Sequence, residues 1–364
     1  MKVVTVFGTR PEIIKLSPVT PLMDKKFEHV IIHTGQHYNY EMDKIFFDEL
    51  ELRNPDYSLN VGSDTHAVQT AKMMVGIEKI LMDYKPDIVN VFADPNTPLA
   101  GALAAAKLNI PVVHIEAGCR SFNKKMPEEI NRILVDHCSE LLLASDKTAV
   151  NNMISEGIHE KNIRLVGSTI VDAVNRNIKL ARKTGVLKNL GLKAGAYIVL
   201  TLHRAENTDN AEVLNGIIKA INHLSKKIAV VFPVHPRTQK ILGRALKISD
   251  SVKRIEPLGY LEFLQLISNA KFIITDSGGI QEEADAVDVP CVIARNETEW
   301  VELVDAGRNI LASTDTEKII GVSETLLNDE SRLNEIKKIG SVRKAGASQK
   351  IVGEIEEYFG GSKK

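Results

Sequence analysis

The sequence predicts an α/β protein made of two doubly wound, Rossmann-like domains that face a central cleft. The chain has 364 residues, which is about two typical domains. Short apolar runs alternate with amphipathic stretches along almost its whole length, a pattern typical of parallel sheets covered by helices on both faces. The runs form two series, which are separated by a lysine- and asparagine-rich stretch at 172–193. We expect the hinge between the domains in that stretch.

The first series predicts an N-terminal domain over residues 1–172. Its strands are expected at 3–7, 29–33, 87–92, 110–114 and 141–144, and its helices at 13–24, 66–83, 98–107 and 127–139. The second series predicts a C-terminal domain over residues 173–345. Its strands are expected at 197–202, 228–234, 252–255, 272–275 and 291–294. In such folds ligands bind beyond the carboxyl ends of the strands, so the cleft is the expected site.

Composition and charge exclude several functions. The net charge of −1 provides no general attraction to nucleic acid or to an anionic membrane surface. No apolar stretch is long enough to span a membrane, and the N-terminal apolar run is too short for a signal peptide. The cysteines are scattered and show no zinc spacing, which predicts no metal site. We therefore expect a reduced, cytoplasmic enzyme.

The stretch at 271–289, KFIITDSGGIQEEADAVDV, contains the strongest local signal for a ligand. It predicts a buried strand, a turn through Ser277, Gly278 and Gly279, and then a helix for which Ser277 is placed to provide the cap. The unpaired amides at the start of such a helix favour a phosphate. Glu283 follows about one helical turn later and can accept hydrogen bonds from a ribose diol. The alternative is an ordinary capped strand-to-helix turn.

The first strand is followed by a second candidate anion site. Gly8 ends the strand, Pro11 suits the first turn of a helix, and Arg10 and Lys15 are expected near the mouth of the cleft. Two cations beside a helix start suit a diphosphate or a carboxylate. The alternative is that both are solvated surface charges. No GxGxxG fingerprint follows any strand, so a dinucleotide cofactor is not predicted.

Acidic residues follow the strands of the first domain at three places. Asp94 and Glu116 come just after predicted strands, and Glu128 lies where Pro127 opens a helix. Carboxylates that share a cleft raise one another's pKa values and can donate and accept protons near neutral pH. Glu128 by itself is also explained as a favourable charge in the first turn of a helix.

The second domain has a histidine and an arginine after each of two strands. These are His203 with Arg204, and His235 with Arg237. A single histidine is more often structural than catalytic. Two such pairs predict a basic wall that faces the acidic residues and suits a nucleotide diphosphate as leaving group.

Together these segments resemble the non-hydrolysing UDP-N-acetylglucosamine 2-epimerases. The resemblance rests on GTRPEIIKLSPV at 8–19, HTGQH at 33–37, HIEAGCRSF at 114–122, MPEEINRILVDH at 126–137, LHRAEN at 202–207, VHPRT at 234–238 and TDSGGIQEEA at 275–284. It implies a fold like that of the GT-B glycosyltransferases, with a C-terminal segment, 346–364, whose helix at 350–359 packs back on the first domain. It also implies a homodimer without a cofactor that acts on a UDP-sugar.

The implied reaction interconverts UDP-GlcNAc and UDP-ManNAc by elimination and re-addition of UDP through 2-acetamidoglucal. By motif position, the resemblance implies that Asp94, Glu116 and Glu128 move protons and that His203 lies near the diphosphate. It implies nucleotide contacts at Arg10, Lys15, Ser277, Gly278 and Gly279, a ribose contact at Glu283, and a uracil pocket at Leu258 and Phe263. Which carboxylate is the base and which the acid stays open.

The chain departs from the family pattern at several positions. Pro95 follows Asp94 where the family has threonine, and we expect this proline to change the direction of Asp94. Trp300 replaces an arginine expected near the diphosphate, and the candidates to replace that cation are Arg295, Arg308 and Arg237. The stretch at 341–346 also differs. Three alternatives therefore stand beside the epimerase: a C2 epimerase of a modified UDP-sugar such as a 2,3-diacetamido uronate, a GT-B glycosyltransferase, and a non-catalytic UDP-sugar-binding protein.

Overall fold

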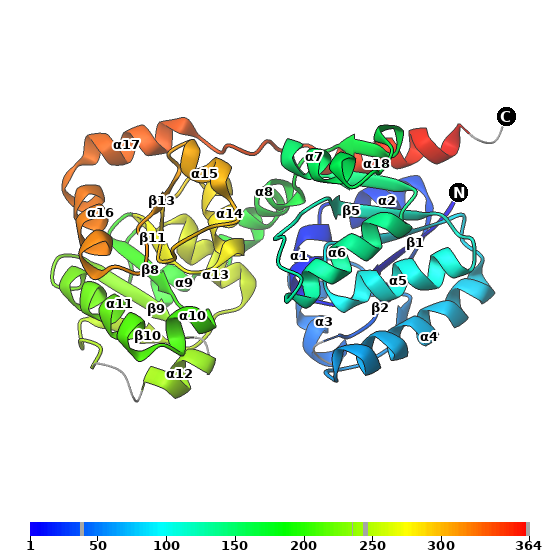
Figure 1. Ribbon diagram of the computed structural model, residues 1–364. Coiled ribbons are helices and arrows are strands. Elements are labelled where there is room, and N and C mark those ends of the chain that lie inside the picture. Colours follow the sequence, from blue (N-terminus) through cyan, green and yellow to red (C-terminus); the bar gives the residue numbers. More distant parts are fainter. Residues whose placement is uncertain (37–39, 235, 243–246, 362–364) are drawn as a thin grey trace. The chain divides into compact units, whose positions relative to one another are not determined.

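Both sheets of the protein are entirely parallel and doubly wound in the computed structural model (Figure 1). The structure describes residues 1–36, 40–234, 236–242 and 247–361. The chain divides into two units: unit 1 is Met1–Ala173 with Lys344–Lys364, and unit 2 is Val174–Arg343. The α/β class expected from the sequence is confirmed. In the described ranges, no helix is long and apolar enough to cross a membrane.

The sheet of unit 1 has seven strands in the order β3-β2-β1-β4-β5-β6-β7. Its strands are β1 (Lys2–Phe7), β2 (Glu28–His33), β3 (Tyr57–Ser58), β4 (Ile88–Phe92), β5 (Val112–Ala117), β6 (Leu141–Ala144) and β7 (Ile163–Leu165). Its helices are α1 (Arg10–Leu16), α2 (Thr20–Lys26), α3 (Tyr40–Glu49), α4 (His66–Tyr84), α5 (Asn96–Lys107), α6 (Pro127–Cys138), α7 (Lys147–Ser155), the 3₁₀ turn η1 (Glu160–Asn162), the first part of α8 (Thr169–Ala181) and α18 (Ala347–Gly360).

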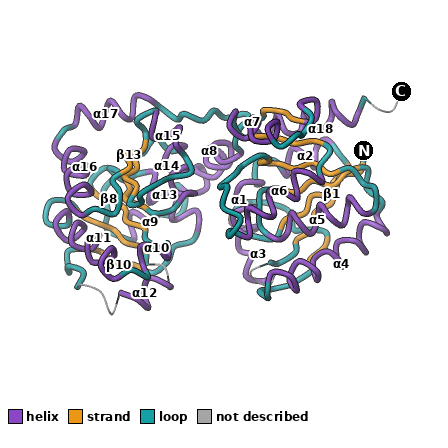
Figure 2. Tube along the Cα trace, viewed as in Figure 1, coloured by secondary structure: helices purple, strands orange, loops and turns teal. Residues whose placement is uncertain are grey.

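Helices cover both faces of this sheet, so its central strands are buried and apolar. Figure 2 shows the strands enclosed by helices. On one face α4, α5 and α6 pack on the valines of β1 and β4. The opposite face is covered in part by α2 and α18, which pack against each other.

The sheet of unit 2 has six strands in the order β10-β9-β8-β11-β12-β13. Its strands are β8 (Tyr197–Thr201), β9 (Ala229–Pro233), β10 (Val252–Ile255), β11 (Ile273–Thr275), β12 (Cys291–Ile293) and β13 (Asn309–Leu311). Its helices are the remainder of α8, α9 (Val186–Asn189), α10 (Ala205–Thr208), α11 (Ala211–Leu224), α12 (Pro236–Leu242), α13 (Tyr260–Ser268), α14 (Gly278–Ala286), α15 (Val301–Asp305), α16 (Thr316–Asn328) and α17 (Glu330–Ile339). Helices α11, α16 and α17 bury their apolar faces on one side of the sheet.

One predicted helix was wrong, and three short strands were missed. The helix expected at 13–24 is divided into α1 and α2, because Pro18 has no amide hydrogen to continue the helical ladder. The strands β3, β7 and β13 were not expected. They contain two or three residues each and lie at sheet edges, so their apolar pattern is too short to distinguish from a loop.

The C-terminal helix packs on unit 1, as the resemblance implied. The Asp172 carboxylate accepts hydrogen bonds of 2.7 Å from the amides of Gly346 and Ser348 at the start of α18. Further along, Glu356 pairs with Lys26 of α2 at 2.6 Å, and Glu354 pairs with Arg164 at 3.0 Å. The chain therefore starts and ends in the same unit.

Candidate active site

Each sheet has one point where the strand order reverses, and several of the candidate residues follow the two strands next to it. In unit 1 this point lies between β1, which leads to Arg10 and Lys15, and β4, which leads to Asp94. In unit 2 it lies between β8, which leads to His203, and β11, which leads to the turn at 277–279. Ligands of doubly wound folds bind at these points, beyond the carboxyl ends of the strands.

A buried carboxyl group holds the turn after β1. Oε2 of Glu12 accepts hydrogen bonds from the Gly8 amide at 3.0 Å, the Thr9 amide at 2.8 Å and the Thr9 hydroxyl at 2.7 Å. Burial raises the pKa of Glu12 to about 8, although the hydrogen bonds from Thr9 and Gly8 oppose the shift. Beside this turn, the Arg10 guanidinium lies 4.9 Å from the centre of the Phe46 ring. The turn that presents Arg10 is therefore fixed from inside the unit.

Asp94 is held by α6 through both its backbone and its side chain. Its Oδ2 accepts from Arg132 Nε at 2.8 Å and Nη2 at 2.6 Å, and its carbonyl accepts from Asn131 at 3.0 Å. The residue before it, Ala93, has a φ of 58°, in the left-handed region that residues other than glycine seldom adopt. Pro95 fits this loop as the residue that precedes α5, with a φ of −65°.

Glu116, at the end of the neighbouring strand β5, also combines a positive φ with a contact to a cation. It has a φ of 63° at the end of β5, and the register between β5 and β6 shifts there. Its carboxylate oxygens accept from Lys15 Nζ at 3.2 and 3.0 Å. Each of the two acidic strand ends thus combines a strained backbone with one cation, and such strain is concentrated at functional sites.

Neighbouring carboxylates in the first turn of α6 have different roles. Glu129 is buried and accepts from the amides of Ser121 at 2.8 Å and Phe122 at 2.9 Å, and also from Arg132. Burial alone would raise its pKa, but these hydrogen bonds lower it. Glu128 is partly exposed, and within the described residues it makes no side-chain hydrogen bond or ion pair. Glu129 therefore anchors a loop, and Glu128 is available to a ligand.

Unit 2 contains a buried aspartate behind its candidate histidine. The Asp276 carboxylate accepts from the backbone amides of His203 and Arg204, from the Asn207 amide group, and faces His203 Nδ1 at 3.1 Å. Burial would raise the pKa of Asp276, but the hydrogen bond and charge of His203 lower it. The ionised Asp276 carboxylate therefore orients the imidazole of His203, which is partly exposed.

The helix start at α14 has the free amides that an anion needs. Ser277 occupies the position before the helix, but its side chain does not cap it, contrary to expectation; its amide instead donates to the Thr275 hydroxyl at 3.0 Å. Gly279 is exposed, and a Cβ there would meet nothing within 4 Å. Glu283 is partly buried on α14. Leu258, just before α13, and Phe263, within α13, are also partly buried.

Trp300 packs on this helix start. Its indole Nε1 donates to the Gly278 carbonyl at 2.9 Å, and the Arg343 guanidinium lies 4.3 Å from the ring centre. Arg343 also pairs with Glu282 of α14 and with Glu302 at 2.6 Å. The two departures from the family pattern, at 300 and 341–346, are therefore in contact.

Two of the three arginines expected to replace the missing cation have other partners, and the side chain of Arg237 lies outside the described part of the chain. Arg295 pairs with Glu206 at 3.0 Å and Glu299 at 2.7 Å, and the buried Arg308 pairs with Asp285 at 3.3 Å. His235 lies outside the described residues. Sequence reasoning missed Arg132 and Asp276. Arg132 lies four residues after Glu128 on the same helix face, and Asp276 directly precedes Ser277, so both had a positional signal.

Comparison with known proteins shows which family the chain resembles. The model of the UDP-N-acetylglucosamine 2-epimerase family matches residues 22–356. A UDP-N-acetylglucosamine 2-epimerase of Methanococcus maripaludis is 53% identical over 337 residues, which cover 90% of this chain and 92% of the relative. A UDP-2,3-diacetamido-2,3-dideoxy-D-glucuronate 2-epimerase of Pseudomonas aeruginosa is 41% identical over 331 residues, which cover 90% and 92%.

A solved structure agrees with this result. The UDP-GlcNAc 2-epimerase of Methanocaldococcus jannaschii, in complex with UDP-GlcNAc and UDP, superimposes with a TM-score of 0.84 at 48% identity, over 98% of this chain and 100% of that one. The sequence motifs, the two doubly wound sheets and these matches lead to one conclusion: the chain belongs to the UDP-N-acetylglucosamine 2-epimerase family.

Proposed function

We propose that the protein interconverts UDP-N-acetylglucosamine and UDP-N-acetylmannosamine by inverting C2 of the sugar. The observation that carries this proposal is the pair of acidic strand ends in unit 1, Asp94 and Glu116, each with a strained residue and a cation beside it. The resemblance in sequence to the M. maripaludis relative and in structure to the M. jannaschii enzyme supports UDP-GlcNAc as the substrate.

The chemistry requires proton transfer and a stabilised leaving group. No carbonyl adjoins C2, so its hydrogen is not acidic enough to be removed alone. A base takes the C2 proton while the bond from C1 to the diphosphate oxygen breaks, and its electron pair leaves with UDP. The resulting 2-acetamidoglucal then receives a proton at C2 on the opposite face, and UDP adds back at C1. No electrons are gained or lost overall, so no redox cofactor is needed.

The proposed roles follow the two units. In unit 2, the α14 amides at Gly278 and Gly279 and the side chain of Ser277 hold the diphosphate beside His203, which Asp276 orients. Glu283 takes the ribose, and Leu258 and Phe263 contact the uracil. His235 belongs to the same proposed binding set on sequence grounds alone.

In unit 1, Asp94, Glu116 and Glu128 move the protons. Arg10 and Lys15 supply positive charge to the leaving diphosphate. Lys15 also pairs with Glu116, because its amine lies 3.0 Å from that carboxylate. Arg132 does the same with Asp94.

The test is incubation with UDP-GlcNAc in deuterated water, followed by proton NMR. We expect deuterium at C2 together with new UDP-ManNAc signals. The variants Asp94→Asn, Glu116→Gln and Glu128→Gln should each lower the rate of exchange by at least about 100-fold, the usual contribution of a general acid or base. Binding of UDP-GlcNAc without C2 exchange by the wild type would refute the proposal and favour the non-catalytic alternative.

A second substrate is favoured by one observation. The P. aeruginosa relative named for a 2,3-diacetamido glucuronate is 41% identical over 90% of this chain. The same C2 inversion on that modified UDP-sugar is therefore the second candidate. Comparing kcat/KM for the two UDP-sugars decides between them, because the reaction is shared and only the contacts to C3 and C6 differ.

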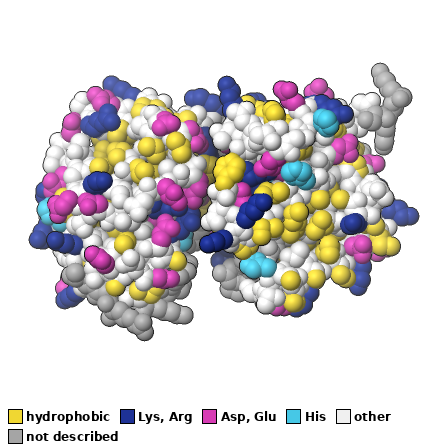
Figure 3. Space-filling model, in the orientation of Figure 1, with side chains coloured by type: hydrophobic (Ala, Val, Ile, Leu, Met, Phe, Trp, Pro, Cys, Tyr) yellow, Lys and Arg dark blue, Asp and Glu magenta, His cyan; other side chains and the backbone are white. Residues whose placement is uncertain are grey.

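We also propose that the protein is a homodimer. Helix α4 exposes Val68, Val75 and Met82 at seven-residue spacing, and α6 exposes Ile130 and Leu134. Figure 3 shows apolar side chains gathered over this part of unit 1. Exposed apolar surface of this kind is typical of protein interfaces. Light scattering should give twice the chain mass for the wild type, and Met82→Asp should shift it toward the monomer.

A further inference from the structure

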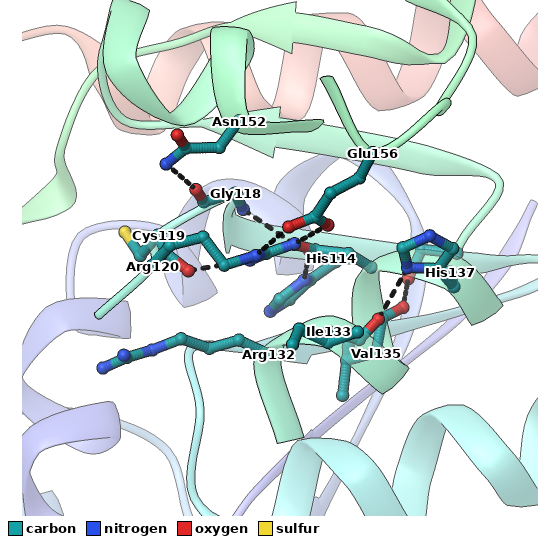
Figure 4. Close-up of polar contacts among 12 residues, drawn as sticks. His114, Gly118, Cys119, Arg120, Arg132, Ile133, Val135, His137, Asn152 and Glu156 are labelled. Carbon is teal, nitrogen blue, oxygen red and sulfur yellow. Dashed lines mark hydrogen bonds and ion pairs between the residues drawn. The ribbon is translucent and has the colours of Figure 1, made fainter. Parts of the chain in front are cut away.

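A largely buried cluster of charged side chains lies in unit 1 (Figure 4). It consists of His114 on β5, Asp136 on α6, Arg120 and Glu156. Asp136 accepts from Arg120 at 2.7 Å, and Arg120 also pairs with Glu156 at 2.6 Å. The proposed function assigns no role to any of these four residues.

His114 connects this cluster to the Asp94 loop. Its Nδ1 lies 2.6 Å from Oδ1 of Asp136, and its Nε2 lies 2.9 Å from the carbonyl oxygen of Ala93. Both partners are hydrogen-bond acceptors, so only an imidazolium with a hydrogen on each nitrogen satisfies both. Ala93 is the residue with a φ of 58° that directly precedes Asp94. The bond to its carbonyl therefore acts where the backbone is strained.

Asp136 connects the same cluster to the Glu116 loop. Its Oδ2 accepts from the Gly118 amide at 3.1 Å, two residues after the strained Glu116. Burial would raise the pKa of Asp136, but the hydrogen bond and charge of His114 and the charge of Arg120 lower it, so it is ionised. Asp136 also lies on α6, the helix whose first turn carries Glu128. One carboxylate is thus tied to the segments that carry all three candidate acids.

We propose that His114 and Asp136 are positioning residues, which hold the backbones of the Asp94 and Glu116 strand ends in the conformation that aims their carboxylates. The side chains of both are buried, at 1% and 0% exposure, so neither contacts the substrate directly. This inference deepens the proposed epimerase function and rests on it for its kinetic test.

Two variants of His114 separate its two hydrogen bonds. In His114→Asn, the amide nitrogen takes the place of Nδ1 and keeps the bond to Asp136, but nothing reaches Ala93. In His114→Gln, the amide nitrogen takes the place of Nε2 and keeps the bond to Ala93. Both lose the same positive charge. His137→Asn is the matched control, because His137 is exposed on α6, the helix that carries Asp136, and among the described residues its side chain bonds only to the Ile133 carbonyl of its own turn, at 2.9 Å.

The kinetic readout is C2 exchange in deuterated water, with kcat and KM for UDP-GlcNAc measured separately. We expect kcat of His114→Asn to fall at least tenfold with KM within twofold of wild type. His114→Gln should retain at least a third of kcat, and His137→Asn should equal wild type. Equal losses in the two His114 variants, or no loss in either, would overturn the inference.

A second readout is independent of activity. Hydrogen–deuterium exchange should quicken in the peptide that contains residues 93–97 in His114→Asn but not in His114→Gln. A wild type that binds UDP-GlcNAc without exchanging C2 would refute the proposed reaction, and the peptide measurement would still decide the role of His114. Unchanged protection of residues 93–97 in His114→Asn would overturn that role.

Discussion

Single residues with positive φ mark the loops that carry the candidate acids. Ala93, Glu116 and Gly118 all adopt the left-handed region within two neighbouring loops, at 58°, 63° and 82°. For residues other than glycine this conformation costs about 1–2 kcal/mol each. The surrounding hydrogen bonds, from His114 and Asp136 among others, offset that cost. The strain is local, and its effects can be tested one residue at a time.

Gly118 should not tolerate a side chain. A Cβ there would lie 2.4 Å from the Ala149 carbonyl oxygen, in addition to the penalty of its positive φ. We expect Gly118→Ala to lower the free energy of unfolding by about 3 kcal/mol. Gly157→Ala is the control, since it has a φ of 86° but nothing within 4 Å of its Cβ, and should cost about 1 kcal/mol. Urea denaturation measures both, and equal costs would contradict the close contact.

Glu12 should make stability depend on pH. Its pKa is raised by burial from 4.5 to about 8, so the folded state binds this proton more tightly than the unfolded state. Its contribution to stability is therefore present below about pH 4.5 and is lost as the pH rises to about 8.

The variant Glu12→Gln isolates this effect. Gln cannot ionise, and its amide oxygen can accept from Gly8 and Thr9. We expect its free energy of unfolding, relative to wild type, to rise by a few kcal/mol between about pH 5 and pH 8. Other titrating groups, such as His33 with a pKa lowered to about 4 by burial, are present in both proteins and cancel. A difference that stays constant with pH would show that Glu12 is ionised throughout.

Among the elements, α14 has two ends with different roles. Its first turn keeps free amides for an anion, and its later residues Glu282 and Asp285 bind the segment at 341–343. Trp300 lies at the first turn, where its indole holds the Gly278 carbonyl, and Arg343 covers the ring. The arginine that the family pattern led us to expect at 300 is thus replaced by a contact that shapes the turn.

Trp300→Phe should weaken binding of UDP. Phenylalanine keeps a ring for Arg343 to cover but cannot donate to Gly278, and one hydrogen bond is worth about 1 kcal/mol. We expect the Kd for UDP, measured by calorimetry, to rise about fivefold. Trp300→Ala loses the stacking as well and should bind more weakly still. Wild-type affinity in both variants would mean that the indole has no role in the anion site.

At the scale of the whole molecule, the chain leaves unit 1 within α8 and returns to it at Lys344. The return is fastened by Asp172, which caps α18, and by the ion pairs of Glu354 and Glu356. Each unit has a hydrophobic core of its own. A mutation that removes one of these contacts should therefore lower the stability of the unit that contains it.

Asp172→Ala should destabilise unit 1 alone. It removes two amide hydrogen bonds of 2.7 Å at the start of α18, and loss of a helix cap costs about 1–2 kcal/mol. Asp315→Ala is the counterpart in unit 2, where Asp315 caps α16 by accepting from Lys318 at 2.9 Å. Hydrogen exchange of peptides from each unit distinguishes them. Faster exchange across both units in either variant would show that the units unfold together.

Much of this protein was determined by local sequence. The central strands, such as β1, β4 and β8, were predicted because continuous apolar runs between helix-forming stretches read as buried parallel strands. The motifs at Asp94, Glu116 and the Ser277 turn predicted site residues at strand ends, because the sequence contains both the residue types and their position after apolar runs. The helix predicted at 13–24 was wrong because Pro18, which has no amide hydrogen, separates α1 from α2.

Tertiary structure alone decided which of these residues meet. No single apolar run encodes the order of the strands in a sheet. Only the fold shows that β1 lies beside β4 and that β8 lies beside β11. The partners across that order, such as Lys15 with Glu116 or Arg343 with Trp300, are separated by many residues and share no local pattern. The positive φ of Ala93 and Glu116 is likewise imposed by long-range bonds, because their own side chains disfavour it. Local propensity selects the elements, and packing between distant segments selects the site.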